Sequence, residues 1–167
     1  TARPDRPPGR GDRAVDLGER LTAAIKPGRF VTVEGGEGAG KSTQTAALVA
    51  WLRERGVDAV ATREPGGAAG ANEIRALLVT GSIDRWSPIA ELLLHFAARA
   101  EHLARTVRPA LERGAWVVCD RFADSTMAYQ GFGHGLGRER VEAVARAAIG
   151  DFSPDLTLLL DAPVEVG

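Results

Sequence analysis

The sequence has little cysteine and no long apolar run. Cys119 is its single cysteine, so an internal disulfide is excluded and a reducing, cytoplasmic setting is expected. No apolar stretch approaches the ~18 residues of a membrane-spanning helix, and the N-terminus shows no apolar core of a secretory signal. A formal net charge of −1 argues against broad binding to nucleic acid or to a membrane surface. A small, locally positive pocket remains compatible with this charge.

What is present is the composition of an ordinary globular protein, with 44% hydrophobic and 26% charged residues. At 167 residues the chain is long enough for one compact domain. Residues 1–27 are predicted to be a partly disordered extension, because 1–13 are rich in proline, glycine and charge. A short amphipathic helix is expected at 14–25. Residues 28–167 are predicted to form the core domain.

A glycine-rich loop organises this core. The segment from Gly35 to Ser42 fits the pattern G-x-x-x-x-G-K-[ST], with a predicted strand at 30–33 before it and a helix at 43–55 after it. Backbone N–H groups of such a loop bind the phosphates of ATP, the lysine reaches the β- and γ-phosphates, and the Ser42 hydroxyl can ligate Mg²⁺. The predicted phosphate-binding residues are Gly35, Gly36, Gly38, Ala39, Gly40, Lys41, Ser42 and Thr43.

Apolar strands alternate with helical patterns along the rest of the chain. Because the strands are continuous apolar runs, they predict a parallel sheet with helices on both faces, the α/β three-layer sandwich of P-loop NTPases. Pro109 is expected to kink or break the longest helix. The loops that follow strand ends should converge on one crevice. Strands are predicted at 30–33, 57–61, 115–119 and 156–160, helices at 43–55, around 74–78, 87–106 and 138–149, and the converging loops at 34–42, 62–70 and 120–131.

Charged residues stand at these strand ends. Asp120 ends the third strand, where it would hold Mg²⁺ together with Ser42; the alternative is an aspartate that caps the next turn. The chain has no Asn/Thr-Lys-x-Asp or Asp-x-x-Gly motif, which argues against a GTPase. Guanidinium groups match phosphate oxygens and base carbonyls, although a lone arginine is usually a solvated surface group. The arginines in question are Arg63, Arg75, Arg99 and Arg121.

Five sequence blocks together resemble bacterial thymidylate kinase, the P-loop kinase that phosphorylates dTMP with ATP. The resemblance runs from about Arg29 to Gly167 and implies ATP and dTMP as substrates, Mg²⁺ as cofactor, and a homodimer that pairs through the helix at 88–105. The P-loop block alone indicates only an NTPase, whereas the second and fourth blocks are much more specific. The blocks are 34–43, 62–67, 96–102, 120–131 and 154–161.

The resemblance implies roles for the arginines. Arg63 and Arg121 would hold the dTMP phosphate, with Arg75 as a helper. Arg99 would donate a hydrogen bond to the thymine O4, and Phe96 would stack on or wall the base. A phosphate monoester is already mostly ionised at neutral pH, so the nucleophile needs no strong general base.

The resemblance also implies roles around the sugar and the base edge. Gln130, with Ser125 or Thr126, would read the remaining polar edge of thymine. Tyr129 would lie under the sugar, where a 2′-hydroxyl would clash. Glu37 would approach the 3′-hydroxyl or the Mg²⁺ shell. The residues expected to act in catalysis are Lys41, Arg121 and Glu37.

The chain departs from the family pattern at several places. Phe122 stands where the family has Tyr or His, and His95 stands where an aromatic residue often precedes the substrate arginine. His95 is interpreted as a helical surface residue, with a place in the base wall as the alternative. Gly38 stands where some relatives have an arginine in the loop. This absence predicts that the missing positive charge comes from the lid, which family members carry beyond the fourth strand. The hypothesis is that these 167 residues bind dTMP but transfer phosphate poorly.

Two other functions stay open at this point. One is a kinase for a different nucleoside monophosphate. The other is a non-catalytic nucleotide-binding protein on the same fold, against which the intact set of Lys41, Ser42, Asp120 and Arg121 argues.

Overall fold

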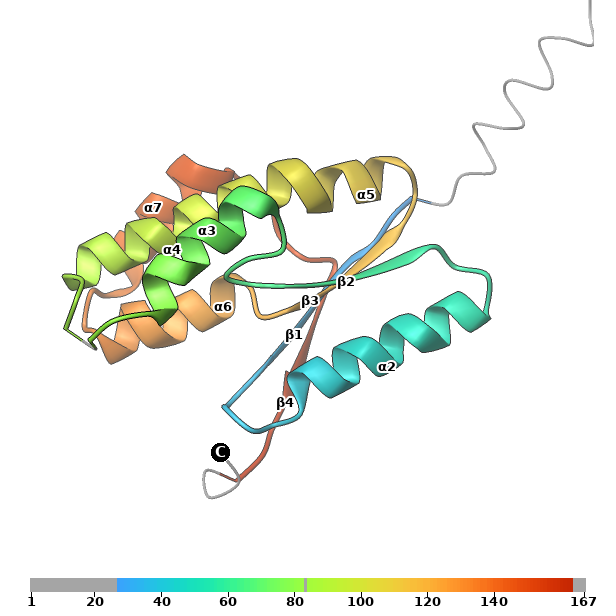
Figure 1. Cartoon of the computed structure of the whole chain (residues 1–167), viewed down its shortest axis with the longest axis horizontal. Helices are drawn as coiled ribbons and strands as arrows, with labels where there is room; N and C mark the ends of the chain where they lie inside the picture. Colours follow the sequence, from blue (N-terminus) through green and yellow to red (C-terminus); the bar gives the residue numbers. More distant parts are fainter. Residues whose placement is uncertain (1–26, 83, 164–167) are drawn as a thin grey trace, which may run out of the picture.

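Four parallel strands form the centre of the computed structural model, which describes residues 27–82 and 84–163 (Figure 1). The tail predicted at 1–27, with its short helix, lies outside the described residues apart from position 27. The strand order β2-β3-β1-β4 places the first strand between two strands that come much later in the chain. The strands are β1 (Phe30–Gly35), β2 (Ala59–Arg63), β3 (Trp116–Asp120) and β4 (Leu156–Leu160).

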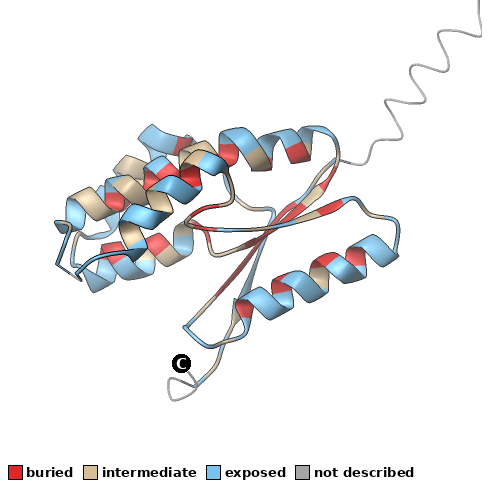
Figure 2. Ribbon diagram, viewed as in Figure 1, coloured by how far each residue is buried: buried red, intermediate tan, exposed pale blue. Residues whose placement is uncertain are grey.

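The sheet is covered by helices on both faces, as predicted. Alternate side chains of a strand point to opposite faces, so Val31 and Val33 pack with α2 (Lys41–Glu54) on one face. Phe30 belongs to a second core cluster on the other face, together with residues of the remaining helices. Figure 2 shows buried positions along the strands and on the helices that pack against the sheet. The α/β three-layer architecture is thereby confirmed.

The second face carries a long helical run. Its first helix begins as predicted, because Ser87 caps it: the Ser87 hydroxyl accepts a hydrogen bond from the Ala90 N–H at 3.4 Å. None of the described helices is long and apolar enough to cross a membrane. The elements on this side are α3 (Ala69–Val79), which packs on α4, then α4 (Pro88–His102), the π-helical turn η1 (Leu103–Val107), α5 (Arg108–Glu112), α6 (Ala123–Thr126), the π-helical turn η2 (Met127–Gly133) and α7 (Arg138–Ile149).

One prediction about helices agrees with the structure and another is wrong. The long helix is interrupted directly before Pro109 by the wide turn of η1, and Pro109 then takes a first-turn position of α5, where its missing N–H costs nothing. The segment 120–131, predicted as a loop, is helical from Ala123 onward, and the glycine-rich connection is therefore shorter than expected. Both segments contain residues with poor helix propensity, which tertiary packing overrides.

Two predictions about strands also need correction. The second strand begins at Ala59 rather than at residue 57. The fourth strand was predicted to be buried, but its side chains are largely exposed, with Leu159 at 73%. The reason is its place in the sheet: β4 pairs with β1 along one edge, and no described helix packs on it with more than a few contacts.

Candidate active site

The glycine-rich loop joins β1 to α2 at the carboxyl edge of the sheet. Gly40 has a φ of +83°, a conformation that glycine adopts without steric cost, and α2 begins at the next residue. The Lys41 ammonium donates a hydrogen bond back to the Gly36 carbonyl, so its side chain arches over the loop. The predicted phosphate-binding residues therefore surround one short turn at a helix N-terminus, where backbone N–H groups attract anions.

Asp120 lies beside this loop because β3 pairs with β1, and Asp120 stands opposite Val33 in the register. The Ser42 hydroxyl donates to the Asp120 carboxylate at 2.5 Å. The helix that follows Asp120 has no side-chain cap, so Asp120 does not cap it. Two oxygen ligands side by side suit Mg²⁺, which takes its other ligands from phosphates and water. Within residues 27–82 and 84–163 no group of three or more His, Cys, Asp or Glu forms a separate metal cluster.

Three arginines and Lys41 line a cavity of about 550 Å³ in front of the loop. Arg63 ends β2 opposite Asp120, and Arg75 reaches in from α3, held by a hydrogen bond to the Pro65 carbonyl at 2.7 Å. Burial and the neighbouring Arg63 cation lower the pKa of Arg75 from its ordinary value, whereas Asp120 acts in the opposite direction. Like charges held this close favour an anion between them.

Arg121 is held from several sides. Its guanidinium donates to the Ser125 hydroxyl at 3.0 Å and to the Gly35 carbonyl at 3.3 Å, and it lies 5.5 Å from the centre of the Tyr129 ring. Its backbone has a φ of +70°, the only positive value at a non-glycine residue among those described. A strained backbone of this kind is typical of functional sites, where the surrounding structure enforces it.

Glu34 is a buried carboxylate that sequence reasoning missed. It accepts hydrogen bonds from the Phe122 N–H at 2.7 Å and from the Ser125 hydroxyl at 2.6 Å. The Ser125 hydroxyl therefore donates its proton to Glu34 and accepts from Arg121, and Ser125 also lines the second cavity described below. The signal was an acidic residue at the end of an apolar strand, a position where a charge is retained only if it is paired.

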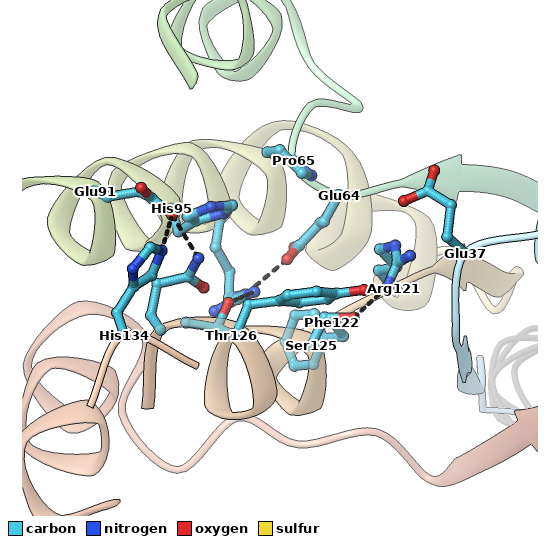
Figure 3. Close-up of a pocket in the computed structure, with 13 residues that line it drawn as sticks. Glu37, Glu64, Pro65, Glu91, His95, Arg121, Phe122, Ser125, Thr126 and His134 are labelled. Atoms are coloured by element: carbon cyan, nitrogen blue, oxygen red, sulfur yellow. Dashed lines mark hydrogen bonds and ion pairs between the residues drawn. The ribbon is translucent and has the colours of Figure 1, made fainter. Parts of the chain in front are cut away.

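A second cavity, of about 270 Å³, lies between α4 and the α6–η2 segment (Figure 3). It opens beside the first cavity, and Glu37 and Arg121 line both. Figure 3 shows His95 and Glu91 of α4 facing Thr126 and His134. The lining residues are Glu37, Glu64, Pro65, Glu91, His95, Arg99, Arg121, Phe122, Ser125, Thr126, Tyr129, Gln130 and His134.

Arg99 is the buried cation of this cavity, with 2% of its surface exposed. Its Nε donates to Glu64 at 2.7 Å and one terminal nitrogen donates to Thr126 at 3.0 Å. The other terminal nitrogen, Nη1, is buried and has no hydrogen-bond partner among the described residues. A buried donor without a partner is costly, so the state of this nitrogen calls for an explanation.

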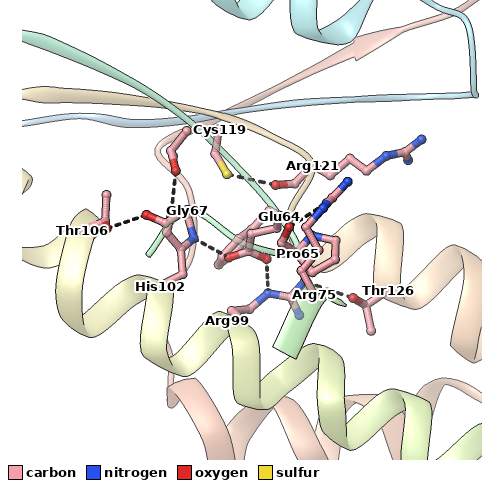
Figure 4. A network of polar contacts seen from close by, with 12 residues as sticks. Glu64, Pro65, Gly67, Arg75, Arg99, His102, Thr106, Cys119, Arg121 and Thr126 are labelled. Atoms are coloured by element: carbon pink, nitrogen blue, oxygen red, sulfur yellow. Dashed lines mark hydrogen bonds and ion pairs between the residues drawn. The ribbon is translucent and has the colours of Figure 1, made fainter. Parts of the chain in front are cut away.

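Glu64 is the centre of a buried network of hydrogen bonds that includes Arg99 (Figure 4). The other Glu64 oxygen lies 2.9 Å from Nδ1 of His102, whose Nε2 lies 2.7 Å from the Thr62 hydroxyl. The network therefore connects the end of β2 to α4 and fixes the direction of the Arg99 side chain. Sequence reasoning gave Glu64 and His102 no role, because such pairing depends on two segments that lie far apart in the chain.

The three aromatic residues near the second cavity differ in their positions. Phe96 lies in the core with 1% exposure, beneath the Arg99 guanidinium at 4.7 Å, and does not line either cavity. Phe122 does line the second cavity while packing edge-on against Phe30 at 5.0 Å. Tyr129 is half-exposed at the rim. Phe96 therefore supports the arginine from below, and Phe122 supplies the apolar wall.

His95 is not the surface residue that the sequence favoured. It lines both cavities, and burial together with the nearby Arg99 lowers its pKa to about 4, against the weaker opposite effect of Glu91 and Glu64. His95 is therefore neutral at pH 7 and faces the same space as Arg99. The alternative, a place in the base wall, agrees with this position.

A glycine-rich loop at a helix N-terminus, an adjacent Ser–Asp pair and a neighbouring arginine-lined cavity define a P-loop NTPase. Residues 33–167 match the sequence profile described as thymidylate kinase. The chain is 60% identical over 138 residues to the thymidylate kinase of Rhizorhabdus wittichii, which covers 83% of this chain and 66% of that protein. It is 57% identical over 140 residues to that of Pseudomonas putida, covering 84% and 67%. The chain belongs to the thymidylate kinase family.

A solved structure supports the same assignment. The crystal structure of thymidylate kinase from Ehrlichia chaffeensis superposes with a TM-score of 0.74 at 40% identity, covering 81% of this chain and 72% of that chain. The chain spans about two thirds of the length of the curated relatives named above.

Proposed function

We propose that this chain binds dTMP in the cavity between α4 and η2, binds the ATP phosphates at the P-loop, and provides the site where the γ-phosphoryl group of ATP passes to dTMP. Transfer by these 167 residues is expected to be slow, because the loop has Gly38 in place of an arginine. The observation that carries the proposal is buried Arg99: the residue lines the second cavity, and its Nη1 has no hydrogen-bond partner among the described residues. This cavity shares Glu37 and Arg121 with the arginine-lined space at the P-loop. Relatives at 60% and 57% identity carry the name thymidylate kinase.

The polar groups of the second cavity would bind the thymine base. Arg99 Nη1 would donate to the thymine O4. Gln130 and Thr126 would contact the adjacent edge, Thr126 being preferred over Ser125, whose proton Glu34 already receives. Phe122 would wall the base in the place first assigned to Phe96. Tyr129 would remain under the sugar.

The chemical part of the proposal needs positioning and positive charge. Lys41, Arg63 and Arg121 would neutralise charge on the transferring group, with Arg75 supporting Arg63. Bound at Ser42 and Asp120, Mg²⁺ would neutralise charge on the ATP phosphates. The dTMP phosphate is already ionised near neutral pH and can attack without a base. Glu37, which is exposed and lines both cavities, would approach a sugar hydroxyl or the Mg²⁺ shell.

The test is calorimetric binding of dTMP, dUMP, dGMP and the ribose form of TMP to the 167-residue chain. We expect the tightest binding for dTMP. Arg99→Ala should weaken dTMP binding by about tenfold or more, because a hydrogen bond to a charged donor is worth roughly 1.5–3 kcal/mol. Equal affinities for all four nucleotides would contradict the assignment of the base pocket, and tighter binding of another monophosphate would favour a different kinase.

We also infer that two copies pair through α4 and that the protein works in the cytoplasm. The support for pairing is an exposed apolar stripe on α4, where Ile89 and Leu93, one helical turn apart, are 40% and 52% exposed. The support for the cytoplasm is the single buried cysteine.

A further inference from the structure

The carboxylate of Glu91 on α4 joins two groups of the facing segment. Its Oε1 accepts a hydrogen bond from Gln130 Nε2 at 2.7 Å and lies 3.2 Å from Nε2 of His134. Gln130 is 4% exposed, and both Gln130 and Glu91 line the second cavity. Figure 3 shows Glu91 and His134 at the end of the cavity that lies away from Glu37.

This contact determines which way the Gln130 amide points. An ionised carboxylate only accepts hydrogen bonds, so the amide NH₂ must face Glu91 and the amide oxygen must face away from it. No hydrogen bond to Gln130 Oε1 exists among the described residues. At this position the group available to a ligand in the cavity is therefore an acceptor, Gln130 Oε1, and not a donor.

Arg99 offers the opposite group, a donor. Its Nη1 can only donate hydrogen bonds, and its Nε donates to the Glu64 carboxylate at 2.7 Å, which fixes the guanidinium. Arg99 and Gln130 both line the second cavity, so a base bound there would meet a donor held by one carboxylate and an acceptor held by another. A pyrimidine with a carbonyl at C4 and a proton on N3 complements this pair. Cytosine, with an amino group at C4 and a bare N3, opposes it at both atoms.

We propose that Glu91 is a positioning residue that selects thymine and uracil over cytosine by holding the Gln130 amide in a single orientation. The inference rests on the proposed function, since it assumes that the base lies in this cavity. Glu91 need not touch the base: it acts through Gln130.

The decisive ligands are dUMP and dCMP, which differ only in the edge in question. Their affinities are measured calorimetrically for the unchanged chain and for Glu91→Gln, with dTMP as a reference. A glutamine at position 91 can donate or accept, which releases Gln130 to turn over. We expect the ratio of dUMP to dCMP affinity to fall about tenfold, the worth of roughly one hydrogen bond. An unchanged ratio in Glu91→Gln would overturn the proposal.

The matched control is Glu101→Gln on the same helix. Glu101 pairs with Arg105 on the surface and lines neither cavity, so the ratio should stay at that of the unchanged chain. If the unchanged chain binds no dTMP and does not prefer dUMP over dCMP, the proposed function itself is wrong. If the unchanged chain prefers dUMP and Glu91→Gln keeps that preference, only the role of Glu91 is wrong.

A double-mutant cycle tests whether Glu91 acts through Gln130. In a Gln130→Ala background, Glu91→Gln should leave the ratio of dUMP to dCMP affinity unchanged, because no amide remains to be oriented. A persistent effect of Glu91→Gln in that background would show a different route and overturn the assignment.

A measurement on the unchanged chain covers the case in which Glu91→Gln does not fold. The sequence contains two glutamines, Gln44 and Gln130, so ¹⁵N-glutamine labelling gives two side-chain amide signals. Gln44 is exposed on α2 and serves as the internal reference. The Gln130 amide protons should exchange with solvent at least tenfold more slowly and remain protected when dTMP is added. Exchange as fast as that of Gln44 would contradict the contact with Glu91.

Discussion

At Arg121 the backbone takes a φ of +70°, although the residue carries a long side chain. The conformation is held by hydrogen bonds from the Arg121 N–H to the Val33 carbonyl at 3.0 Å and from the Cys119 thiol to the Arg121 carbonyl at 3.1 Å. It turns the guanidinium toward Ser125 and the P-loop. The strain is therefore tied to the placement of the cation.

This strain predicts an ordering of two variants. Arg121→Gly should be more stable than Arg121→Ala by about 1 kcal/mol, because only glycine adopts a left-handed conformation without steric cost. Both variants should lose affinity for dTMP alike. Chemical denaturation measures the stability difference, and calorimetry measures the affinity. Equal stabilities of the two variants would mean that the backbone relaxes in the absence of the arginine.

Single residues were predictable where a local pattern carried them. Lys41, Ser42 and Asp120 follow from the motif and from the end of an apolar strand, and the structure brings them together. Glu34, Glu64 and Glu91 were not predictable, because the role of each depends on a partner from a distant segment. His95 was misinterpreted for a similar reason: its helix position alone does not reveal that α6 and η2 close over it.

At the scale of elements, α4 is the support of the second cavity. It contributes Glu91, His95 and Arg99 to the lining and binds the end of β2 through Glu64. Both members of the Arg99–Glu64 pair are almost fully buried. A buried pair of this kind is more costly to break than to lack altogether, since the remaining charge stays without a partner.

Glu64→Ala should therefore destabilise the fold by roughly 3–5 kcal/mol, the usual cost of leaving one charge of a buried pair alone. Glu101→Ala, which removes a carboxylate from the surface of the same region, should cost no more than about 0.5 kcal/mol. Urea denaturation of the two variants provides the comparison. A Glu64→Ala variant as stable as Glu101→Ala would show that water or another group takes the place of the carboxylate.

Elements were predictable from apolar runs and caps. The strands at 30–33 and 115–119 and the helix after Ser87-Pro88 lie where expected, because burial on both faces or a strong cap sets them. The helical segment 123–133 was not, because its residues are mostly polar or glycine. It forms because Glu34 holds its first turn and α7 packs against it. The exposure of β4 follows from strand order, which no local pattern reveals.

For the molecule as a whole, the partly buried imidazole of His95 predicts a dependence of stability on pH. Its pKa is about 4 in the folded protein and near 6.5 in the unfolded chain, so between these values the unfolded state binds more protons. Stability should fall as the pH is lowered from about 6.5 to about 4, by at most about 3 kcal/mol, and level off below.

Thermal unfolding across this pH range, with His95→Gln as the comparison, isolates the effect. The variant should show a shallower loss of stability, because glutamine does not titrate. Identical pH profiles for the two proteins would assign the loss to other groups. Asp155, whose pKa is lowered by the Phe30 N–H and Arg29, should affect stability mainly at lower pH.

The strand order also bears on how the protein is made. β1 and α2 leave the ribosome early, yet β1 pairs only with β3 and β4, and β2 pairs only with β3. A nascent chain that ends before Trp116 has no partner strand for either, and its P-loop has no Asp120 beside it. The nucleotide site therefore cannot assemble piece by piece during translation. We expect it to form only after the third strand has been made, because β3 pairs with both β1 and β2.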